Sequence, residues 1–393
     1  MLKHIFSLLL IATTLTATAQ VDTTHLRISL VTCGTGDEIW ETFGHTAVRI
    51  IDSTKTGPGR DLVYNYGTFN YDNGFELKFM RGKLLYYLSV YPFSDFMQEY
   101  ITDKRSVEEQ LLMLNGEQKV ALATFLDWNA EPQNSYYKYD FYFDNCATRI
   151  RDIFPKILGK DFQFARALPD SNLTFRNITN QYFYKKHWER LGVDILLGSK
   201  VDKKMSNEEI MFLPDFLRDG ITGASLNEQK IAGKTVLLLP GSAHEPAGIN
   251  QPLIFTCLLA LLIIAGIVFK PLWIVYKIAS RLILLTTGLL GFIILTMWFA
   301  TDHQTCRDNL NILWALPTNI ILAFAKPKGR NRYAVVGIVL VLVSLFLHVL
   351  KIQELPVEII PFLLGLLFTY SMVYKESKQQ ATKSKIQVPN SNA

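Results

Sequence analysis

The sequence predicts an α+β soluble domain followed by an all-α membrane domain of five helices. Charged residues occur throughout residues 20–250 but nearly disappear after residue 250, where apolar runs follow one another. Within residues 20–250, short runs alternate apolar and polar residues as strands do, and helix-start signals separate them. We therefore expect a signal peptide at 1–19, a soluble domain at 20–250, a membrane domain at 251–375 and a basic tail at 376–393.

The amino terminus, MLKHIFSLLLIATTLTATAQ, has the pattern of an export signal. A basic start at Lys3 precedes a short apolar run, and Ala17-Thr-Ala19 forms a small-x-small cleavage site. The apolar run is too short to span a bilayer as an anchor. No cysteine follows the cleavage site, so the mature protein is not expected to be a lipoprotein itself.

Composition argues against several other classes. The net charge of +5 over 393 residues is mild, so we expect no nucleic-acid partner. The four cysteines show no CxxC spacing, which argues against a zinc knuckle or a thioredoxin-like motif. We expect no cofactor and no metal. In an exported protein, a disulfide between Cys33 and Cys146 remains an open alternative.

The soluble part begins with strands and ends in a segment of weak periodicity. Helices are expected at 95–103, capped by Ser94, and at 116–129, where Asn115 and Gln118 form a capping box. Residues 160–250 show little periodicity and are expected to form an irregular extension over the core or toward the membrane. Extended segments are predicted at 25–34, 45–52, 62–69, 83–91 and 136–143, with the second and third paired as a hairpin.

Five apolar segments make up the predicted membrane domain. The third is the weakest, because it is short and contains Asn311, Pro317 and Asn319. The segments are slightly shorter than the roughly 20 residues that a spanning helix needs, so flanking residues must complete them. They lie at 253–269, 282–300, 310–325, 333–350 and 359–374.

Charge gives an independent test of this count. With the soluble domain outside, eleven Lys and Arg residues fall in the inside segments, whereas the outside loops hold only Arg307 and Lys351. This asymmetry follows the positive-inside rule and places the carboxy terminus in the cytoplasm. Omitting the third helix would move the basic residues of 326–332 outside, so the charges favour five helices.

Cys146 is the candidate nucleophile. Asp144 or Asn145 is a good N-cap, which puts Cys146 in the first turn of a helix. Unpaired N–H groups and the helix dipole there stabilise an anion and lower a thiol pKa from ~8.5 toward about 3.5–7.5. Ala147, Ile150 and Phe154 form the apolar face that would hold this helix in place.

A thiolate nucleophile also needs a base. Of the seven histidines, His45 differs from the others because it opens a strand directly after Gly44. A backbone can approach a ligand closely at a glycine, so an imidazole there can project over a cleft. A histidine that is simply satisfied within a strand is an equally good reading of His45 taken alone.

The order of these motifs is similar to that of known proteins. GHTAVRI at 44–50 followed by FDNCATRIR at 143–151 resembles the circularly permuted papain-like folds of the NlpC- and LRAT-like group, in which the strand histidine precedes the helix cysteine. Within that group the chain most resembles the Lnb family, lipoprotein N-acyltransferases with a papain-like periplasmic domain and a membrane domain behind it. The resemblance covers nearly the whole mature chain and rests on WETFGHTAVRI, YNYGTFNY, FMRGKLLYYL, FDNCATRIRD, FLPDFL and TDHQTCRDNLNILWALP.

The resemblance implies that Cys146 is the nucleophile and His45 its base. In permuted folds the group that orients the histidine lies on the next strand, which points to Asn65, although an ordinary strand residue is an equally good reading. Arg149 and Arg151 project from the nucleophile helix and are candidates to bind a lipid phosphate. The structural alternative for these arginines is an ion pair with Asp140 or Asp152.

The segment TDHQTCRDNLNILWALP, at 301–317, is polar and is predicted to lie outside, at the same surface as the soluble domain. His303 and Trp314 are therefore candidates for substrate binding. The polar residues of the third apolar segment indicate backbone that lines a cavity or meets protein. The alternative is an ordinary loop with Trp298 and Trp314 at the membrane interface.

These features predict a ping-pong acyltransferase of the inner membrane that faces the periplasm. A phospholipid would donate an acyl chain to Cys146, and the α-amine of a diacylated lipoprotein would accept it. Five membrane helices favour lipid substrates, since a cell-wall peptidase needs one anchor at most. The alternatives are a membrane-anchored cysteine peptidase or amidase that acts on peptidoglycan, and a non-catalytic papain-like module that binds lipid or protein.

Overall fold

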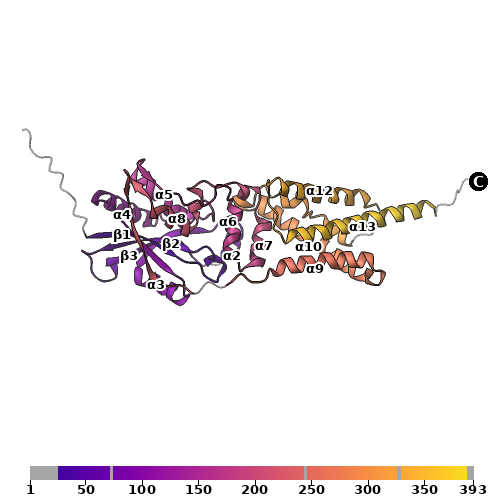
Figure 1. The fold of residues 1–393 in the computed structure, drawn as a ribbon, viewed down its shortest axis with the longest axis horizontal. Helices are drawn as coiled ribbons and strands as arrows, with labels where there is room; N and C mark the ends of the chain where they lie inside the picture. The colour runs from indigo at the N-terminus through magenta and orange to yellow at the C-terminus, as the bar shows by residue number, and fades with distance from the viewer. Residues whose placement is uncertain (1–24, 71–73, 243–245, 325–328, 387–393) are drawn as a thin grey trace, which may run out of the picture.

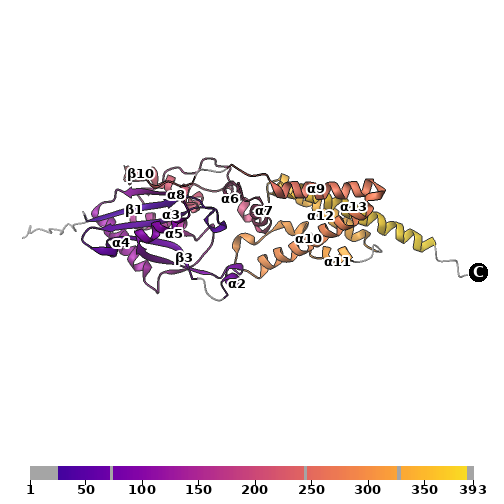
Figure 2. The same cartoon turned by 90° about the horizontal axis from the view of Figure 1, so that it is seen from below.

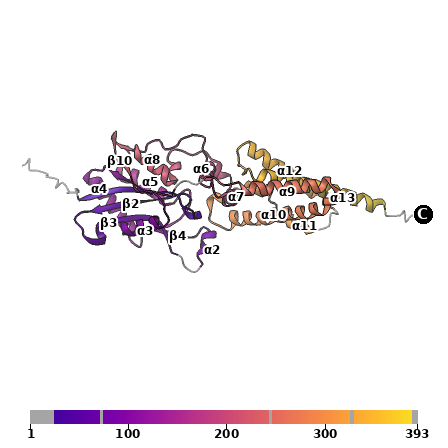
Figure 3. The same ribbon diagram turned by 60° about the horizontal axis from the view of Figure 1, so that its bottom comes forward.

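The computed structural model describes residues 25–70, 74–242, 246–324 and 329–386, and the predicted signal peptide lies outside these ranges. The molecule is elongated, with a mixed α+β domain at one end and a helical domain at the other (Figure 1). Between them lie α6 (Phe175–Tyr182) and α7 (His187–Leu196), as Figure 3 also shows.

A seven-stranded antiparallel sheet forms the centre of the α+β domain, in the order β10-β5-β1-β2-β3-β4-β6. The strands β1, β2 and β3 follow one another as hairpins, because turn-forming residues separate runs of alternating apolar residues. The strands are β1 (Leu26–Cys33), β2 (His45–Asp52), β3 (Asp61–Phe69), β4 (Leu85–Pro92), β5 (Val107–Leu112), β6 (Tyr136–Lys138) and β10 (Ala232–Leu239). A small second sheet contains β7 (Phe162–Gln163), β8 (Ser225–Leu226) and β9 (Gln229–Lys230).

Helices cover both faces of the main sheet. On one face, α4 (Gly116–Ala130), α5 (Cys146–Leu158) and α8 (Pro214–Thr222) bury the core that contains Leu30 and Val48. On the other face, α3 (Phe93–Thr102) packs on Val31 and Ala47 (Figure 1). The alternating side chains of β1 and β2 thus enter two different cores, as the period of a strand requires.

Most predicted elements are present, with some corrections. The capping box of Asn115 and Gln118 begins α4 as predicted. Ser94 does not cap α3, whose N-cap is Pro92. The region 160–250 is more ordered than predicted, since α6, α7 and α8 and the edge strand β10 all lie in it. These helices are only eight to ten residues long, and so short a segment shows little periodicity in sequence.

The helical domain contains four helices long and apolar enough to cross a membrane among the residues described. They are α9 (Gln251–Val268), α10 (Trp273–Phe299), α12 (Asn331–Val349) and α13 (Ile359–Ile386). The predicted third spanning helix, 310–325, is not a continuous helix within its described part. It contains a 3-10 turn over Leu310–Leu313 and the short helix α11 (Asn319–Phe324). Pro317 lies between these pieces and interrupts helical hydrogen bonding.

The segment between α10 and α12 nevertheless passes from one end of the bundle to the other. At its start, the backbone nitrogen of Asp302 donates to the carbonyl of Arg81 in the α+β domain at 2.9 Å. At its end, the backbone nitrogen of Arg330 donates to Ser377 Oγ near the far end of α13 at 3.0 Å. The orientation predicted from the charges requires the chain to pass from one end of the helical domain to the other at this place. It does not require a continuous spanning helix there.

Protein contacts satisfy the polar groups of this interrupted segment. Asn319 has no exposed surface, donates to Thr287 Oγ1 at 2.9 Å and accepts from Tyr370 Oη at 2.8 Å. Gly288 and Gly291 of α10 face its backbone, and a β-carbon on Gly291 would lie only 2.1 Å from the carbonyl oxygen of Ala315. Small residues permit such close backbone approach within membranes. The polar residues of this segment thus meet protein, one of the two possibilities considered from sequence.

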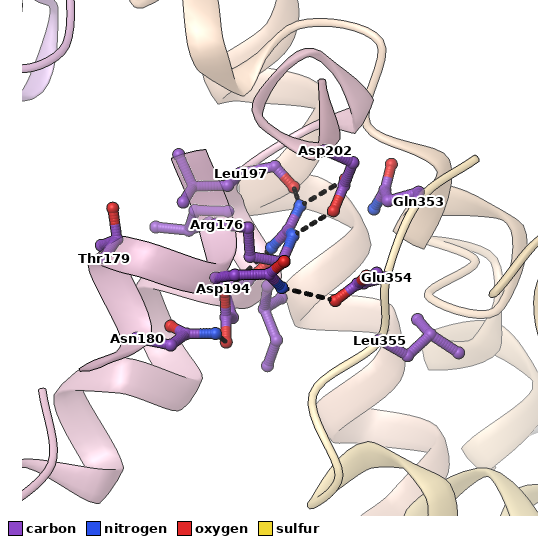
Figure 4. A network of polar contacts seen from close by, with 12 residues as sticks. Arg176, Thr179, Asn180, Asp194, Leu197, Asp202, Gln353, Glu354 and Leu355 are labelled. Carbon is purple, nitrogen blue, oxygen red and sulfur yellow. Dashed lines mark hydrogen bonds and ion pairs between the residues drawn. The ribbon is translucent and has the colours of Figure 1, made fainter. Parts of the chain in front are cut away.

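A buried polar network joins the two domains (Figure 4). Arg176 of α6 donates to Asp194 Oδ1 at 2.9 Å and to Asp202 Oδ1 at 2.8 Å, and all three side chains are almost fully buried. The adjacent Asn177 donates to Glu354 Oε2, in the loop between α12 and α13, at 2.9 Å. Further bonds in this region include those from Asn309 Nδ2 to the carbonyl of Ile195, at 2.8 Å, and from Arg190 to Glu358. Residues 175–202 therefore attach the α+β domain to the membrane domain.

Candidate active site

Cys146 is the first residue of α5, and the helix start that holds it is tightly bonded. Asn145 is the N-cap, and its side-chain oxygen accepts from the Thr148 backbone nitrogen at 2.9 Å. The Thr148 hydroxyl in turn accepts from the Asn145 backbone nitrogen at 2.8 Å. The side-chain nitrogen of Asn145 also donates to the carbonyls of Phe141 and Phe212, at 2.8 and 2.9 Å. The thiol is thus held at a fixed helix start, as the sequence predicted.

His45 begins β2, directly after Gly44. Gly44 has φ of 73°, and a β-carbon there would lie 2.6 Å from the carbonyl oxygen of Cys33. Both facts explain why a glycine precedes the histidine. The imidazole of His45 and the thiol of Cys146 are hydrogen-bonded to each other. The strand histidine and the helix cysteine, a hundred residues apart in sequence, therefore form one unit in space.

Asn65 of β3, the predicted orienting residue, lies next to the imidazole of His45. The His45 ring nitrogen Nε2 lies 2.6 Å from Asn65 Oδ1, and Asn65 Nδ2 donates to Tyr91 Oη at 2.8 Å. Because the amide oxygen can only accept, Nε2 must carry a proton, which leaves Nδ1 for the thiol. Asn65 thus sets the tautomer of His45 and its orientation.

Gly67 lies against this group at a bulge in β3. The pairing of β3 with β4 shifts between Asn65 and Thr68, and Gly67 has φ of 98°. A β-carbon on Gly67 would lie 3.5 Å from the His45 ring and 3.8 Å from Cys146 Cβ. A bulge re-aims neighbouring side chains, and here it brings the backbone of Gly67 against the His45 ring and Cys146.

The electrostatics favour a thiolate–imidazolium pair. Burial opposes ionisation of Cys146, but the charge and hydrogen bond of His45 and the backbone N–H groups of Thr46 and Ala147 lower its pKa below the usual thiol value. Burial likewise opposes protonation of His45, but the charge and hydrogen bond of Cys146 and the bond from Asn65 raise the pKa of the imidazole. The two shifts have opposite signs, as an activated thiol requires.

Cys33 is a free, fully buried thiol of β1, and Cys146 is also free, so the disulfide that the sequence left open is not formed. Burial raises the pKa of Cys33, and its side chain is hydrogen-bonded to Tyr100. Cys33 therefore has the character of an inert core thiol, in contrast to Cys146.

Arg149 and Arg151 both have partners within the protein. Arg149 forms a two-pronged ion pair with Asp144, with Nη2 2.7 Å from Oδ2, and its guanidinium lies 4.1 Å from the centre of the Tyr137 ring. Arg151 pairs with Asp152 at 2.7 Å, which is one of the ion pairs considered from sequence. Within the described residues, the side-chain hydrogen bonds of both arginines go to residues other than Cys146, His45 and Asn65.

His303 and Trp314, the two candidate substrate-binding residues of the outer loop, lie in different parts of the structure. The His303 ring lies 3.1 Å from the carbonyl oxygen of Phe79, at the surface of the α+β domain. Trp314 has no exposed surface, and its ring nitrogen donates to Asn311 Oδ1 at 3.0 Å within the core of the helical domain. The structure therefore does not bring Trp314 to the thiol, and we do not include it in the proposed site.

Two tyrosines near the thiol were not singled out from sequence. Tyr137 and Tyr139 follow one another on and after β6, and both interact electrostatically with Cys146. The hydroxyl of Tyr137 is buried and has no hydrogen-bond partner in the described structure. The run YYKYD shows only the alternation of a strand, so no local signal distinguishes these rings.

The site lies at the end of the α+β domain that meets the membrane domain. Lys138, the last residue of β6, forms an ion pair of 2.7 Å with Asp302, which follows α10. A β-carbon on Gly82 would lie 3.2 Å from the backbone nitrogen of His303. Among the residues described, no group of three or more His, Cys, Asp or Glu side chains could hold a metal ion.

Two models of known protein families match the chain, one in each domain. A model of the Lnb N-terminal periplasmic domain matches residues 13–181, and a model of the Lnb transmembrane domain matches residues 244–380. Neither the curated proteins nor the solved structures contain a significant match to the chain. The two matched domains occur in the order in which the structure shows an α+β domain and a helical domain. The chain therefore belongs to the Lnb family and is a membrane protein with a periplasmic N-terminal domain.

Proposed function

We propose that the protein is a lipoprotein N-acyltransferase in which Cys146 is the nucleophile, His45 the base and Asn65 the residue that orients the base. One observation carries this proposal: the hydrogen-bonded relay from Cys146 through His45 to Asn65 lies where the periplasmic domain meets the membrane domain. A nucleophile, a base and an orienting group in contact are the minimum for covalent catalysis. Lnb family membership supports the choice of lipoprotein acylation.

The proposed fold of the periplasmic domain is a circularly permuted papain-like fold. It is supported by the chain order, since the histidine strand β2 precedes the cysteine helix α5. It is also supported by an antiparallel sheet against which α5 packs through Ala147 and Ile150, both without exposed surface.

In the first half-reaction the Cys146 thiolate attacks the carbonyl carbon of a phospholipid acyl ester. The tetrahedral intermediate collapses with cleavage of the carbon–oxygen ester bond. The imidazolium of His45 gives its proton to the departing alkoxide, so lysophospholipid leaves and an acyl thioester remains on Cys146. The opposite directions of the two pKa shifts favour the thiolate and the imidazolium that this step requires.

In the second half-reaction the α-amine of a diacylglyceryl cysteine at the amino terminus of a lipoprotein attacks the thioester. His45, now neutral, takes a proton from the amine as the carbon–nitrogen bond forms. The carbon–sulfur bond then breaks, the Cys146 thiolate is released, and the acceptor leaves as the N-acylated lipoprotein. Both substrates are lipids, and each can reach a site beside the membrane domain.

Two donors are proposed for the negative oxygen of the tetrahedral intermediates. The backbone N–H of Ala147 lies in the first turn of α5 and already donates to the Cys146 side chain. The buried hydroxyl of Tyr137, which has no partner within the described ranges, is the second. Preorganised donors of this kind supply much of the catalysis in acyl transfer.

Arg149, Arg151 and His303 remain proposals as substrate-binding residues. A donor phosphate at Arg149 or Arg151 would have to displace Asp144 or Asp152 from its present ion pair. His303 is better placed to guide a lipid, because it lies between α2 (Phe75–Met80) and the end of α10.

The proposed orientation places the carboxy terminus in the cytoplasm, with five crossings of which the third is the broken segment. The positive-inside asymmetry supports this orientation. A periplasm-only reporter fused near Pro246 should be active, and one fused after Lys385 should be silent. An active reporter after Lys385 would remove the third crossing from the count.

The function is tested with purified protein, phospholipid vesicles and a synthetic diacylglyceryl-cysteine peptide. The expected products are a peptide heavier by one acyl chain and an equal amount of lysophospholipid, with an acyl thioester on Cys146 when peptide is omitted. Cys146→Ala and His45→Ala should each abolish the products while the protein stays folded in membranes. Release of free fatty acid without acylated peptide would identify a lipase instead.

The same assay separates the alternatives. A cysteine peptidase or amidase would cleave peptidoglycan stem peptides and leave the phospholipid intact. A non-catalytic binding module would retain lipid without forming a thioester, and Cys146→Ala would not alter that retention. Either result would refute the acyltransferase.

A further inference from the structure

The short helix α2 presents apolar side chains outward beside the membrane domain. Leu77, Phe79 and Met80 expose 48%, 51% and 56% of their surfaces. The carbonyl of Arg81, which follows α2, accepts from the backbone of Asp302, just beyond the end of α10. Figure 2 shows α2 next to this end of α10. An exposed apolar surface in this position is a candidate contact with lipid.

Neighbouring residues continue a lipid-facing surface onto α2. Phe299, the last residue of α10, exposes 74% of its surface and stacks on Trp298 with ring centres 5.1 Å apart. Tryptophan is enriched where membrane proteins pass through the bilayer interface. Directly after α2, Arg81 and Lys83 are exposed and suited to anionic headgroups. Apolar residues next to cations are typical of segments that lie in a bilayer surface.

A row of aromatic rings leads from α2 toward the thiol. Successive ring centres are 6.2 Å apart for Phe79 and Phe75, 5.2 Å for Phe75 and Phe69, 5.1 Å for Phe69 and Tyr86, and 4.2 Å for Tyr86 and Tyr139. The row thus begins on α2, passes along the end of β3 and reaches Tyr139, just before α5.

Both ends of the row distinguish it from an ordinary aromatic core. At the outer end, Phe79 is half exposed, and Phe69, further along, exposes 40% of its surface. At the inner end, Tyr139 interacts electrostatically with Cys146, and Gly67, two residues before Phe69, lies against Cys146, since a β-carbon on Gly67 would be 3.8 Å from Cys146 Cβ. An apolar strip that joins a bilayer surface to a nucleophile fits an alkyl chain better than it fits a polar substrate.

We propose that α2 inserts into the periplasmic leaflet of the bilayer and that the aromatic row from Phe79 to Tyr139 guides a phospholipid acyl chain to Cys146. Delivery to the thiol rests on the acyltransfer proposed above, whereas insertion of α2 does not.

Insertion is tested by photocrosslinking of the full-length Cys146→Ala protein, which cannot turn over. A benzophenone amino acid replaces Leu77, and a matched protein carries it at Met113, an apolar residue with 62% exposure just before α4 at the far end of the domain. Both are placed in vesicles of phosphatidylethanolamine and phosphatidylglycerol with a radiolabelled acyl chain. Burial of one large apolar side chain corresponds to about a tenfold preference or more, so position 77 should capture at least about tenfold more lipid than position 113. Equal capture would overturn the proposal.

Guidance is tested by the rate of thioester formation on Cys146 from two esters: a long-chain phospholipid and water-soluble p-nitrophenyl butyrate. Phe69→Ser should lower the ratio of the long-chain rate to the short-chain rate about tenfold, and Phe69→Leu should restore it. An unchanged ratio would overturn the proposal, because the serine then affects both esters alike.

The two experiments also separate this inference from the proposed function. If the wild-type protein forms no thioester from either ester while position 77 still captures lipid, the acyltransferase proposal fails and insertion of α2 is supported. If thioester forms normally and position 77 captures no lipid, the acyltransferase stands and insertion is overturned.

Discussion

Removal of the Asn65 side chain by Asn65→Ala should slow thioester formation about ten- to hundredfold. The bond of 2.6 Å from His45 Nε2 to Asn65 Oδ1 strengthens when His45 becomes an imidazolium. Hydrogen bonds to charged groups contribute about 1.5–3 kcal/mol, and each ~1.4 kcal/mol changes a rate tenfold. The alanine also frees the other tautomer of His45, in which Nδ1 cannot accept the thiol proton.

The rate is measured in a single turnover, as the mass increase of the intact protein after mixing with phospholipid vesicles. Two matched variants control for structural damage. Asn65→Asp keeps an acceptor for Nε2 and should retain most of the rate, with a His45 pKa higher than in the wild type. Tyr91→Phe removes the partner of Asn65 Nδ2 but leaves the acceptor in place, so its rate should fall less than that of Asn65→Ala.

A wild-type rate in Asn65→Ala would refute the assignment of Asn65 as the orienting residue. Equal losses in Asn65→Ala and Tyr91→Phe would refute it too, because they would show that the local packing of β3 and β4, rather than the bond to His45, determines the rate. Thermal unfolding in detergent checks that all the variants are folded.

Three further predictions follow from the geometry. Alkylation of Cys146 by iodoacetamide should be fast at pH values below the usual thiol pKa. His45→Ala should move the rise of the alkylation rate to higher pH, because the imidazolium that lowers the thiol pKa is lost. A pH profile that does not move would contradict the ion pair of Cys146 and His45. Arg176→Met leaves Asp194 and Asp202 buried without their cation, so it should lower the free energy of unfolding, measured with denaturant, by about 3–5 kcal/mol. The control Lys203→Met breaks an exposed ion pair with Glu209 and should lower it by less than about 1 kcal/mol. Asn319→Leu should lower the unfolding temperature in detergent, with a loss of about 1–3 kcal/mol, because Thr287 and Tyr370 lose their bonds to it; no change would show that the broken crossing is held by packing alone.

The local positions of Cys146 and His45 could be predicted from sequence, and their order along the chain, similar to that of permuted papain-like folds, indicated that they belong together. Cys146 follows an N-cap, and His45 opens a strand after a glycine, so both positions are defined by backbone rules. The bond from His45 to Asn65 agrees with the position that the resemblance to permuted folds implied for the orienting residue.

Tyr137, Tyr139 and Trp314 show why other parts were not predictable. The first two belong to an aromatic run without a motif, and only the pairing of β6 with β4 brings it beside α5. Tryptophan is typical of the membrane interface, and Trp314 was expected near it. Its ring instead packs on Phe362 of α13. A loop in sequence gives no indication of which helix it will contact.

The third membrane segment illustrates a different limit. Its charges and its length predicted a passage along the bundle, which the segment makes, but as a spanning helix, which it is not, because the positive-inside rule concerns where a chain emerges and not how it crosses. The signals of a broken crossing were in fact present, as Pro317 and two asparagines within an apolar run. These signals indicate an interrupted helix only once Gly288 and Gly291 of α10 are known to lie against the segment, because glycines there leave room for irregular backbone.

The joint between the domains bears on how the proposed reaction proceeds. Bonds from Asn177 to Glu354 and from Arg190 to Glu358 attach residues 175–202 to the membrane domain, and the buried pairs of Arg176 with Asp194 and Asp202 hold that segment together. With these bonds formed, both lipids must come to the thiol. In the proposed ping-pong reaction, lysophospholipid must leave before the lipoprotein amine can approach the thioester. A short surface element such as α2, with few buried contacts, is a better candidate for the moving part than either domain.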